Sequence, residues 1–253
     1  MNILAKLYTN SPKQAIDDIA TQREKNGHCI VHFLYFANIA GYDLLSTKWK
    51  VQSTKKAYNY YDSLLTADFL LPDGIALQIF YRTAVKTNRI QSKKSWLSNC
   101  NGTDLTLPLL QQIHHGNPVH IYWGTPTGVQ GAAQFLRTQD IVPVSATHGY
   151  VDFDWSNVDP SKKNILLIGR WTPLQEQWVQ DHMTQIQKHN MLVVSVGWLF
   201  DFWSGEEKRT PKIFRGWAEW LRRLIINPRK NAIKVRYSLY LPYAIIRYLL
   251  LKR

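Results

Sequence analysis

Short apolar runs alternate along the chain with longer segments in which apolar and polar residues mix. The apolar runs are rich in Val, Ile and Leu and are bounded by Gly, Pro or Asn, which predicts buried strands. The longer segments show the spacing of amphipathic helices. The predicted strands are 28–36, 67–71, 119–124, 165–169 and 191–197, and the predicted helices are 12–26, 54–66, 75–85, 103–115, 127–138 and 174–188. Such alternation predicts an α/β fold with a parallel sheet and helices on both faces.

The pattern changes after Pro211, where the alternation stops. Residues 212–226 and 229–250 have helical spacing, carry many Lys and Arg residues, and contain interleaved Trp and Tyr. The pair Asn227-Pro228 separates the two segments. We therefore divide the chain into an α/β domain, residues 1–207, and a basic, amphipathic helical appendage, residues 208–253.

Charge supports this division. The chain has 31 Lys and Arg residues against 18 Asp and Glu, a formal net charge of +13. Residues 208–253 hold 13 of the basic residues and a single acid, Glu219, so that the appendage carries +12 and the rest of the chain +1. A neutral domain with a strongly basic end predicts an anionic partner, such as a membrane surface, a phosphate or a nucleic acid.

Several classes of protein are excluded. Residues 1–9 lack the apolar core of a signal peptide, and no uninterrupted apolar run is long enough to span a bilayer. Cys29 and Cys100 cannot build a disulfide framework. The adjacent His114 and His115 have no partner at metal-ligand spacing, which argues against a zinc site. We expect a cytoplasmic protein that associates with the membrane only peripherally.

Candidate chemistry lies where the predicted strands end, because ligands of parallel α/β sheets bind beyond the carboxyl ends of the strands. Four loops rich in Gly and polar residues occupy such positions. They are Asp73-Gly74, Gly124 to Gly128, Gly169 to Glu176, and Gly197 to Gly205.

Each loop has an ordinary structural explanation beside the functional one. Asp73 is placed to act as a general base, or it caps the helix that follows. The loop from Gly124 to Gly128 either brings backbone N–H groups to a phosphate or forms a plain tight turn. Glu176 is explained by helix-start chemistry. The sequence Asp152-Phe153-Asp154 has the spacing of a metal-binding acidic pair.

Taken together, these segments resemble the WecG/TagA/CpsF glycosyltransferases, which build bacterial wall teichoic acids, enterobacterial common antigen and capsular or exported polysaccharides. The resemblance covers about residues 67–236 and follows the order of the family's motifs. The matching residues are Ala67-Asp68-x-x-Leu71-Pro72-Asp73-Gly74-Ile75, Gly102-Thr103-Asp104-Leu105, Tyr122-x-Gly124 through Gly128-Val129, Gly169-x-x-x-Pro173-x-Gln175-Glu176-x-Trp178, Gly197-x-x-Phe200-Asp201-x-x-x-Gly205, Lys208-Arg209-x-Pro211, Glu219-Trp220-Leu221-x-Arg223-Leu224 and Pro228-Arg229-Lys230.

The resemblance implies a Rossmann-like domain whose appendage docks at a membrane. It also implies inverting transfer, without a metal or other cofactor, from a UDP-sugar to a polyprenyl-diphosphate-linked acceptor. Asp73 matches the family's proposed base. The residues that the resemblance assigns to the donor are Asn38, Thr103, Asp104, Gly124, Gln175 and Asp201, and those assigned to the acceptor diphosphate are Arg223, Arg229 and Lys230.

Some positions depart from the family pattern. Asn99 stands where the family has an Arg before its Gly-(Ser/Thr)-Asp motif, and Lys93, Lys94 and Arg89 are the candidates to replace it. Trp198 and Leu199 replace a Gly pair. These changes fall near the expected sugar pocket, so the donor sugar is either of the N-acetylmannosamine type or a uronic acid.

The function predicted from the sequence is therefore glycosyl transfer at the inner face of the cytoplasmic membrane, in the synthesis of exopolysaccharide, capsule, teichoic acid or common antigen. A homo-oligomer is compatible with the sequence. Two alternatives stay open: a non-catalytic scaffold of a polysaccharide assembly complex, and a nucleic-acid-binding protein, which the basic, aromatic-rich appendage would also suit. We expect no nucleic-acid partner, because no binding motif is present. A dinucleotide-dependent enzyme is disfavoured because the chain lacks a GxGxxG fingerprint.

Overall fold

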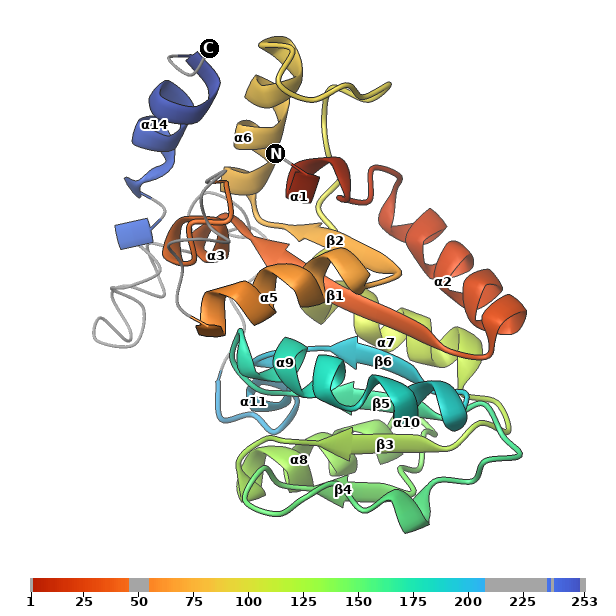
Figure 1. The fold of residues 1–253 in the computed structure, drawn as a ribbon. Helices are drawn as coiled ribbons and strands as arrows, with labels where there is room; N and C mark the ends of the chain where they lie inside the picture. The colour runs from red at the N-terminus through yellow and green to blue at the C-terminus, as the bar shows by residue number, and fades with distance from the viewer. Residues whose placement is uncertain (1, 46–54, 208–235, 238, 251–253) are drawn as a thin grey trace.

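A computed structural model shows a six-stranded, fully parallel sheet enclosed by helices (Figure 1). It describes residues 2–45, 55–207, 236–237 and 239–250. The strands lie in the order β2-β1-β6-β5-β3-β4. Their bounds are β1 Cys29–Tyr35, β2 Phe69–Asp73, β3 Val119–Tyr122, β4 Ser145–Thr147, β5 Ile165–Ile168 and β6 Leu192–Ser195. The predicted α/β class, with a Rossmann-like parallel sheet, is confirmed.

Two features of the strands differ from the sequence prediction. The edge strand β4 was not predicted, because it has only three residues, all partly exposed, and so carries no apolar run. The strand β2 was predicted to stop at Pro72, yet it includes both Pro72 and Asp73, which pair with Leu34 and Tyr35 of β1. Proline is tolerated there because β2 lies at the edge of the sheet.

The helices cover both faces of the sheet. One face is covered by α2 (Pro12–Asn26), α7 (Gly102–Ile113), α8 (Pro126–Arg137) and α11 (Leu199–Trp203), and the other by α5 (Lys55–Thr66), α9 (Leu174–Asp181) and α10 (Met183–Lys188). Near β2 lie α1 (Asn2–Ala5), α3 (Phe36–Gly41) and α6 (Ile75–Lys86).

Successive residues of β1 face opposite layers. Val31 and Phe33 enter the core shared with α2, α7 and α8, whereas Ile30 and Leu34 face the opposite side. This is the two-residue period of a strand. Complete burial of one such side chain stabilises the fold by about 1.5–3 kcal/mol.

Most predicted helices are confirmed, and local chemistry explains their ends. Helix α2 begins where the Ser11 hydroxyl accepts a hydrogen bond from the Gln14 N–H, and it ends at Gly27, which has a φ of 77°. The single helix predicted over 174–188 is instead two, α9 and α10, which meet at His182. The His182 ring stacks on Trp178 at 4.1 Å, and its Nδ1 lies 2.8 Å from the Trp178 carbonyl oxygen, which also accepts the His182 N–H.

The described end of the chain packs against the α/β domain. Helix α14 (Leu241–Ala244) continues into a π-helical segment, Ile245–Leu250, beside α6. Arg89 Nε donates a hydrogen bond to the Leu249 carbonyl at 2.9 Å. The Tyr248 hydroxyl donates another to Asp43 Oδ1 at 2.9 Å. The predicted domain boundary at 207/208 adjoins residues outside those described and stays a prediction.

Close packing of α8 against α11 predicts a cost for any side chain at Gly131. A Cβ atom there would lie 2.3 Å from Ser204 Cβ and 2.6 Å from the Ser204 Cα. Since backbone atoms yield little, we expect Gly131→Ala to lower the free energy of unfolding by about 1–2 kcal/mol despite its better helix propensity. Chemical denaturation measures this.

The matched control is Gln130→Ala, on the exposed side of the same helix. It should change stability by less than about 0.5 kcal/mol. Equal stability of the two variants would contradict the packing described.

Candidate active site

The carboxyl ends of all six strands meet along one edge of the sheet, at the left in Figure 1. Along this edge the direction of the chain changes between β3 and β5. From β3 the chain passes through α8 to β4 on one side, and from β5 it passes through α9 and α10 to β6 on the other side. Such a switch point is where α/β proteins bind ligands. We call the loops that follow the strands along this edge the rim.

Asp73 is the last residue of β2, and its side chain is buried at 3% exposure. Its Oδ2 accepts a long hydrogen bond, 3.4 Å, from the Gly102 N–H at the start of α7. The alternative that Asp73 caps the following helix is wrong, because Gly74 is the N-cap of α6 and no side chain caps it. A buried carboxylate at the rim suits a general base.

Asn99, which replaces the family's arginine, holds the turn beside Asp73. Its Oδ1 accepts a hydrogen bond from the Gly74 N–H at 2.9 Å. Two of the candidate replacements are engaged elsewhere: Arg89 with Leu249, as above, and Lys94, whose Nζ donates to Asn10 Oδ1 at 2.5 Å. Asn99 therefore places a neutral, hydrogen-bonding side chain where the family pattern has a cation.

Thr103 and Asp104 lie in the first turn of α7, beside Asp73. Asn101 is the N-cap of this helix, and its Oδ1 accepts the Thr103 N–H at 2.9 Å. The Thr103 hydroxyl also donates to Asn101 Oδ1. Asp104 is exposed. The structure thus brings Asp73, Thr103 and Asp104 to one end of the rim.

Gln175 joins the ends of β5 and β6. Its Oε1 accepts the Gly197 N–H at 3.0 Å and the Arg170 N–H at 3.4 Å, and its Nε2 donates to Glu176 Oε1 at 2.9 Å. The carboxylate fixes which way the amide points, because only the NH₂ group can donate to it. Gln175, which is 4% exposed, therefore sits between two strand ends in a single orientation.

Glu176 is not the ordinary helix-start residue that the sequence predicted. It is fully buried, and burial raises its pKa to about 7. Its Oε1 accepts the Thr172 hydroxyl at 3.0 Å, whereas its Oε2 has no hydrogen-bond partner within the described part of the chain. A carboxyl group with one open oxygen, buried among polar side chains, is typical of a binding site.

Asn38 reaches the same cluster from α3. Its Nδ2 donates to the Tyr60 hydroxyl at 3.2 Å. The Tyr60 and Tyr42 rings lie 4.9 Å apart, and the Tyr42 hydroxyl donates to the Thr172 carbonyl at 3.3 Å. Burial, helped by the nearby Glu176, raises the pKa of Tyr60 well above its usual value, so its hydroxyl stays neutral.

Gly124 and Asp201 both lie near the start of α8. Gly124 admits no side chain, since a Cβ atom would lie 2.9 Å from Val129 Cγ2 and 3.1 Å from Phe200. A Cβ atom on Gly128 would lie 3.7 Å from Asp201 Oδ1 and 3.9 Å from Glu206 Oε2. Two carboxylates thus face the start of this helix. The expectation that its N–H groups receive a phosphate does not suit these charges; hydroxyl groups suit them better.

Arg170 and Trp123 are rim residues that the sequence analysis did not single out. The Arg170 guanidinium lies 4.3 Å from the centre of the Trp123 ring and 5.4 Å from that of Trp171. Trp123 directly follows β3, and Arg170 is the second residue after β5. The signal that would have found them is this position, combined with a cation and large aromatic rings.

The acidic pair Asp152 and Asp154 forms no metal-binding cluster with other residues that the structure describes. Asp154 accepts hydrogen bonds from the Ser156 N–H at 3.0 Å and from Asn157 Nδ2 at 2.8 Å, and so caps a short 3-10 helix. Among the described residues, no group of three His, Cys, Asp or Glu could hold a metal ion. Metal independence stays a prediction. Arg223, Arg229 and Lys230 lie outside the described residues.

The buried carboxyl of Glu176 predicts a pH-dependent stability. Its pKa rises on folding from 4.5 to about 7, so the native state holds the proton more tightly and loses stability as the pH rises between these values. Tyr42 and Tyr60, which face it, stay neutral in this range. Glu176→Gln removes the titration, so the melting temperature of the variant relative to the wild type should rise between pH 5 and pH 7.5.

The exposed Glu24→Gln variant should show no such rise, since the pKa of Glu24 is lowered by its hydrogen bond with Lys163. Thermal melts of the three proteins across this range test the assignment. A difference that does not change with pH would contradict it.

Comparison with protein families agrees with this geometry. A model of the glycosyl transferase WecG/TagA/CpsF family matches residues 2–253, essentially the whole chain. The match therefore includes the rim loops and the C-terminal region, and it extends beyond the segments in which the sequence motifs were recognised. The chain belongs to the WecG/TagA/CpsF family of glycosyltransferases, enzymes of polysaccharide synthesis.

Proposed function

We propose that this glycosyltransferase moves a sugar, with inversion, from a UDP-sugar to a polyprenyl-diphosphate-linked acceptor at the inner face of the cytoplasmic membrane. The observation that carries the proposal is the buried Asp73 carboxylate at the β2 end of the rim, three strand positions from β5 at the switch point of the sheet. This arrangement separates a proton acceptor from the expected nucleotide site by the width of a few strands.

The chemistry follows from that separation. Asp73 takes the proton of the acceptor hydroxyl, whose oxygen forms a bond to the anomeric carbon. The bond from this carbon to the β-phosphate oxygen breaks, and its electron pair leaves with the nucleoside diphosphate. Attack from the side opposite to the leaving group inverts the configuration. A positioned base of this kind contributes roughly 10²–10⁴-fold to the rate.

The rim provides room for an elongated donor. In the strand order, β5 lies three positions from β2. At a strand spacing of about 4.8 Å, this corresponds to roughly 14 Å. A nucleotide at the switch point therefore extends its sugar past Gln175 toward Asp73. Asp201 suits the hydroxyl groups of the donor, because a carboxylate accepts hydrogen bonds from them.

The polar cluster of Asn38, Tyr60, Gln175 and Glu176 lies between these two ends. Its groups are neutral amides, a neutral phenol and a carboxyl with a pKa of about 7. Such groups recognise hydroxyl and acetamido substituents, which favours an N-acetylmannosamine-type donor. A uronic acid is the alternative, and it would need a cation near the sugar.

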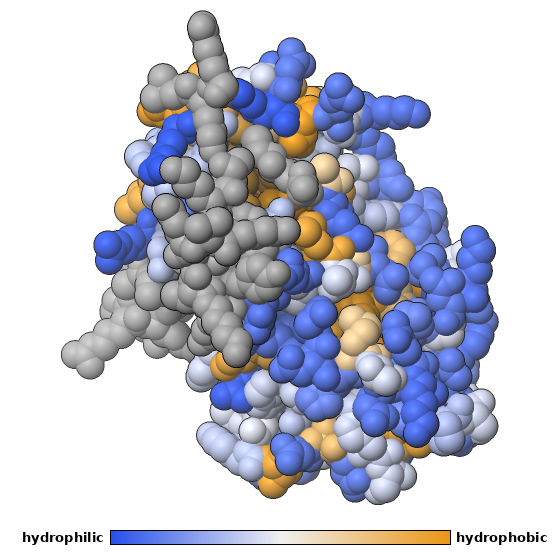
Figure 2. Space-filling model, viewed as in Figure 1, coloured by the Kyte–Doolittle hydropathy of each residue, from blue (hydrophilic) through white to orange (hydrophobic). Residues whose placement is uncertain are grey.

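The C-terminal region supplies the membrane contact in this proposal. The described part exposes Leu239, Tyr243, Ile246 and Leu250, with Leu239 at 73% exposure. Figure 2 shows apolar surface at the upper end of the molecule, where Figure 1 places α6 and α14. None of the described helices is long and apolar enough to cross a bilayer. Basic residues near a lipid surface add about 1 kcal/mol each.

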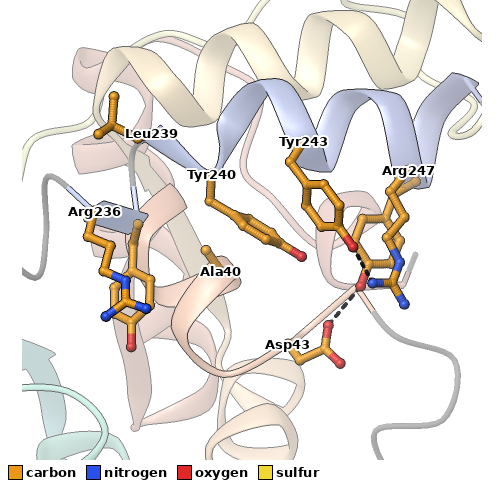
Figure 3. Close-up of a pocket in the computed structure, with 9 residues that line it drawn as sticks. Ala40, Asp43, Arg236, Leu239, Tyr240, Tyr243 and Arg247 are labelled. Carbon is orange, nitrogen blue, oxygen red and sulfur yellow. Dashed lines mark hydrogen bonds between the residues drawn. The ribbon is translucent and has the colours of Figure 1, made fainter.

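A hollow between α3 and the C-terminal helix favours binding of an anionic partner near the C-terminal region. It has a volume of about 560 Å³ (Figure 3). Arg236 and Arg247 stand at its two sides, with tyrosine rings between them. We assign the acceptor diphosphate to this region together with Arg223, Arg229 and Lys230.

The alternatives from the sequence have less support. A non-catalytic scaffold does not agree with membership of a glycosyltransferase family. A nucleic-acid-binding protein would leave the buried Asp73 and Glu176 without a task, and no contact among the described residues favours it.

Replacement of the proposed base gives a direct test. Asp73→Asn keeps the shape of the side chain but cannot take a proton, so transfer should fall at least about 100-fold. Donor affinity should stay within a few-fold. UDP release with a polyprenyl-diphosphate-linked acceptor measures transfer, after thermal shifts with a set of UDP-sugars have identified the donor.

The exposed Asp181→Asn on α9 is the matched control and should transfer at the normal rate. An Asp73→Asn enzyme with near-normal turnover would remove Asp73 from the mechanism.

The membrane contact has its own test. The triple variant Leu239→Ser, Ile246→Ser and Leu250→Ser removes exposed apolar groups, so its partition onto phosphatidylglycerol vesicles should fall about tenfold or more. Binding of the wild type should also weaken as salt is raised, because salt screens exposed charges. Co-sedimentation measures both effects.

The control is the double variant Val142→Ser and Val144→Ser, which alters two exposed valines, at 70% and 56% exposure, before β4. It should bind vesicles as the wild type does. If the triple variant did so too, the C-terminal apolar groups would not be the contact.

A further inference from the structure

The described part of the rim is acidic, with one exception. Its loops, residues 36–45, 73–74, 123–128, 148–154, 169–176 and 196–207, contain eight Asp or Glu residues and a single Lys or Arg, which is Arg170. A diphosphate bound at the described rim would therefore meet several carboxylates and one permanent cation. The position of Arg170 decides where such an anion is tolerated.

Arg170 lies at the switch point, directly after Gly169, the first residue beyond β5. Its guanidinium is held over the Trp123 ring at 4.3 Å and near the Trp171 ring at 5.4 Å. Within the described part of the chain, this guanidinium makes no hydrogen bond or ion pair, so its N–H donors are open toward the described residues. A cation–π contact holds the charge in place without using these donors, which leaves them for a forked contact with phosphate oxygens.

The backbone is strained at Trp123, whose ring lies under the Arg170 guanidinium. Trp123 has a φ of 72°, in the left-handed region that a bulky residue rarely adopts. Its N–H donates to the Thr147 carbonyl at 2.9 Å, and its ring packs so closely on Gly149 that a Cβ atom there would lie 1.6 Å from Trp123 Cδ1. The rings of Tyr122 and Trp123 are also stacked, with their centres 5.7 Å apart. Strain of this kind persists where the surroundings enforce it, and it gathers at functional sites.

The other anion site expected at the switch point is blocked. The start of α8 faces the carboxylates of Asp201 and Glu206, and the Thr127 hydroxyl donates to Glu206. These charges oppose a phosphate at the helix N-terminus. Within the described rim, the open donors of Arg170 are then the remaining strong group for a diphosphate.

We propose that Arg170, held over the Trp123 ring and near Trp171, binds the diphosphate of the nucleotide-sugar donor and stabilises it as it leaves. This inference rests on the proposed function. When the bond between the anomeric carbon and the β-phosphate oxygen breaks, that oxygen keeps the electron pair and the nucleoside diphosphate gains one negative charge. Asp73 meanwhile takes the proton of the attacking hydroxyl. Arg170 provides the positive charge where the negative charge develops.

Position distinguishes the donor diphosphate from that of the lipid acceptor. Arg170 follows β5, whereas Asp73, where the acceptor hydroxyl is deprotonated, ends β2 at the edge of the sheet. The hollow with Arg236 and Arg247 adjoins α3, on the β2 side. The acceptor diphosphate therefore belongs there, and the donor diphosphate belongs to Arg170.

The test compares the affinities of UDP, UMP and uridine for the full-length wild type and Arg170→Gln by calorimetry. If Arg170 contacts only phosphate oxygens, Arg170→Gln should weaken UDP binding at least tenfold, weaken UMP less, and leave uridine unchanged. Arg170→Lys, which keeps the charge but loses the planar fork, should fall between. A merely structural role for the stack would instead weaken all three ligands alike.

Arg82→Gln is the matched control, because Arg82 also stacks on an indole, that of Trp96 at 5.4 Å, but from α6. It should bind UDP as the wild type does.

Two results for Arg170→Gln would overturn the inference: a UDP affinity within twofold of the wild type, or an equal loss of affinity for UDP and uridine. Failure of the wild type to bind UDP at all would instead overturn the proposed function. A loss confined to UDP-glucuronic acid, with UDP itself unaffected, would move Arg170 to the sugar carboxylate and likewise overturn the diphosphate assignment.

Discussion

Parallel pairing of six short strands is the constraint from which the site of this enzyme follows. The strands inside the sheet are buried and mostly apolar, so polar side chains gather where the strands end. Because all strands run in the same direction, their ends fall on one edge, and residues from distant parts of the chain meet there. Gln175 strengthens this convergence by bonding at once to the backbone that leaves β5 and to that which leaves β6.

Acidic and basic side chains lie at different places along that edge. Carboxylates gather at the rim: Asp73 at its β2 end, Asp201 and Glu206 at the start of α8, and Glu176 buried between them. This distribution suits hydroxyl-rich sugars and a proton acceptor, but it opposes phosphates. Arg170 provides the positive charge in the described rim. Many of the other Lys and Arg residues lie in the basic C-terminal region, residues 208–253. In the proposed reaction, the donor diphosphate therefore belongs at Arg170 beyond β5, and the acceptor diphosphate belongs beside the C-terminal region on the β2 side.

Burial changes the chemistry of the side chains in the middle of the rim. Glu176 and Tyr60 lose the stabilisation that water gives to their charged forms, so the pKa of each rises. Tyr60 then acts as a neutral hydrogen-bonding group, and Glu176 takes up or releases a proton near neutral pH. In the proposed reaction, this weakly charged lining lies between the base Asp73 and the cation Arg170, so a polar sugar binds there without competing for either charge.

Local periodicity and short motifs were enough to predict the fold class, most helices, the strand-end position of Asp73 and the family. The sequence did not determine the edge strand β4, which has no apolar run, nor the break at His182, which depends on a ring contact. It placed Gln175 and Asp201 in loops, but it could not show that Gln175 bridges two strands. Nor could it show that Glu176 is buried, that carboxylates face α8, or that the Arg170 guanidinium lies over the Trp123 indole. Each of these depends on residues far apart in the chain, which only the packing of the sheet and helices brings within a few ångströms.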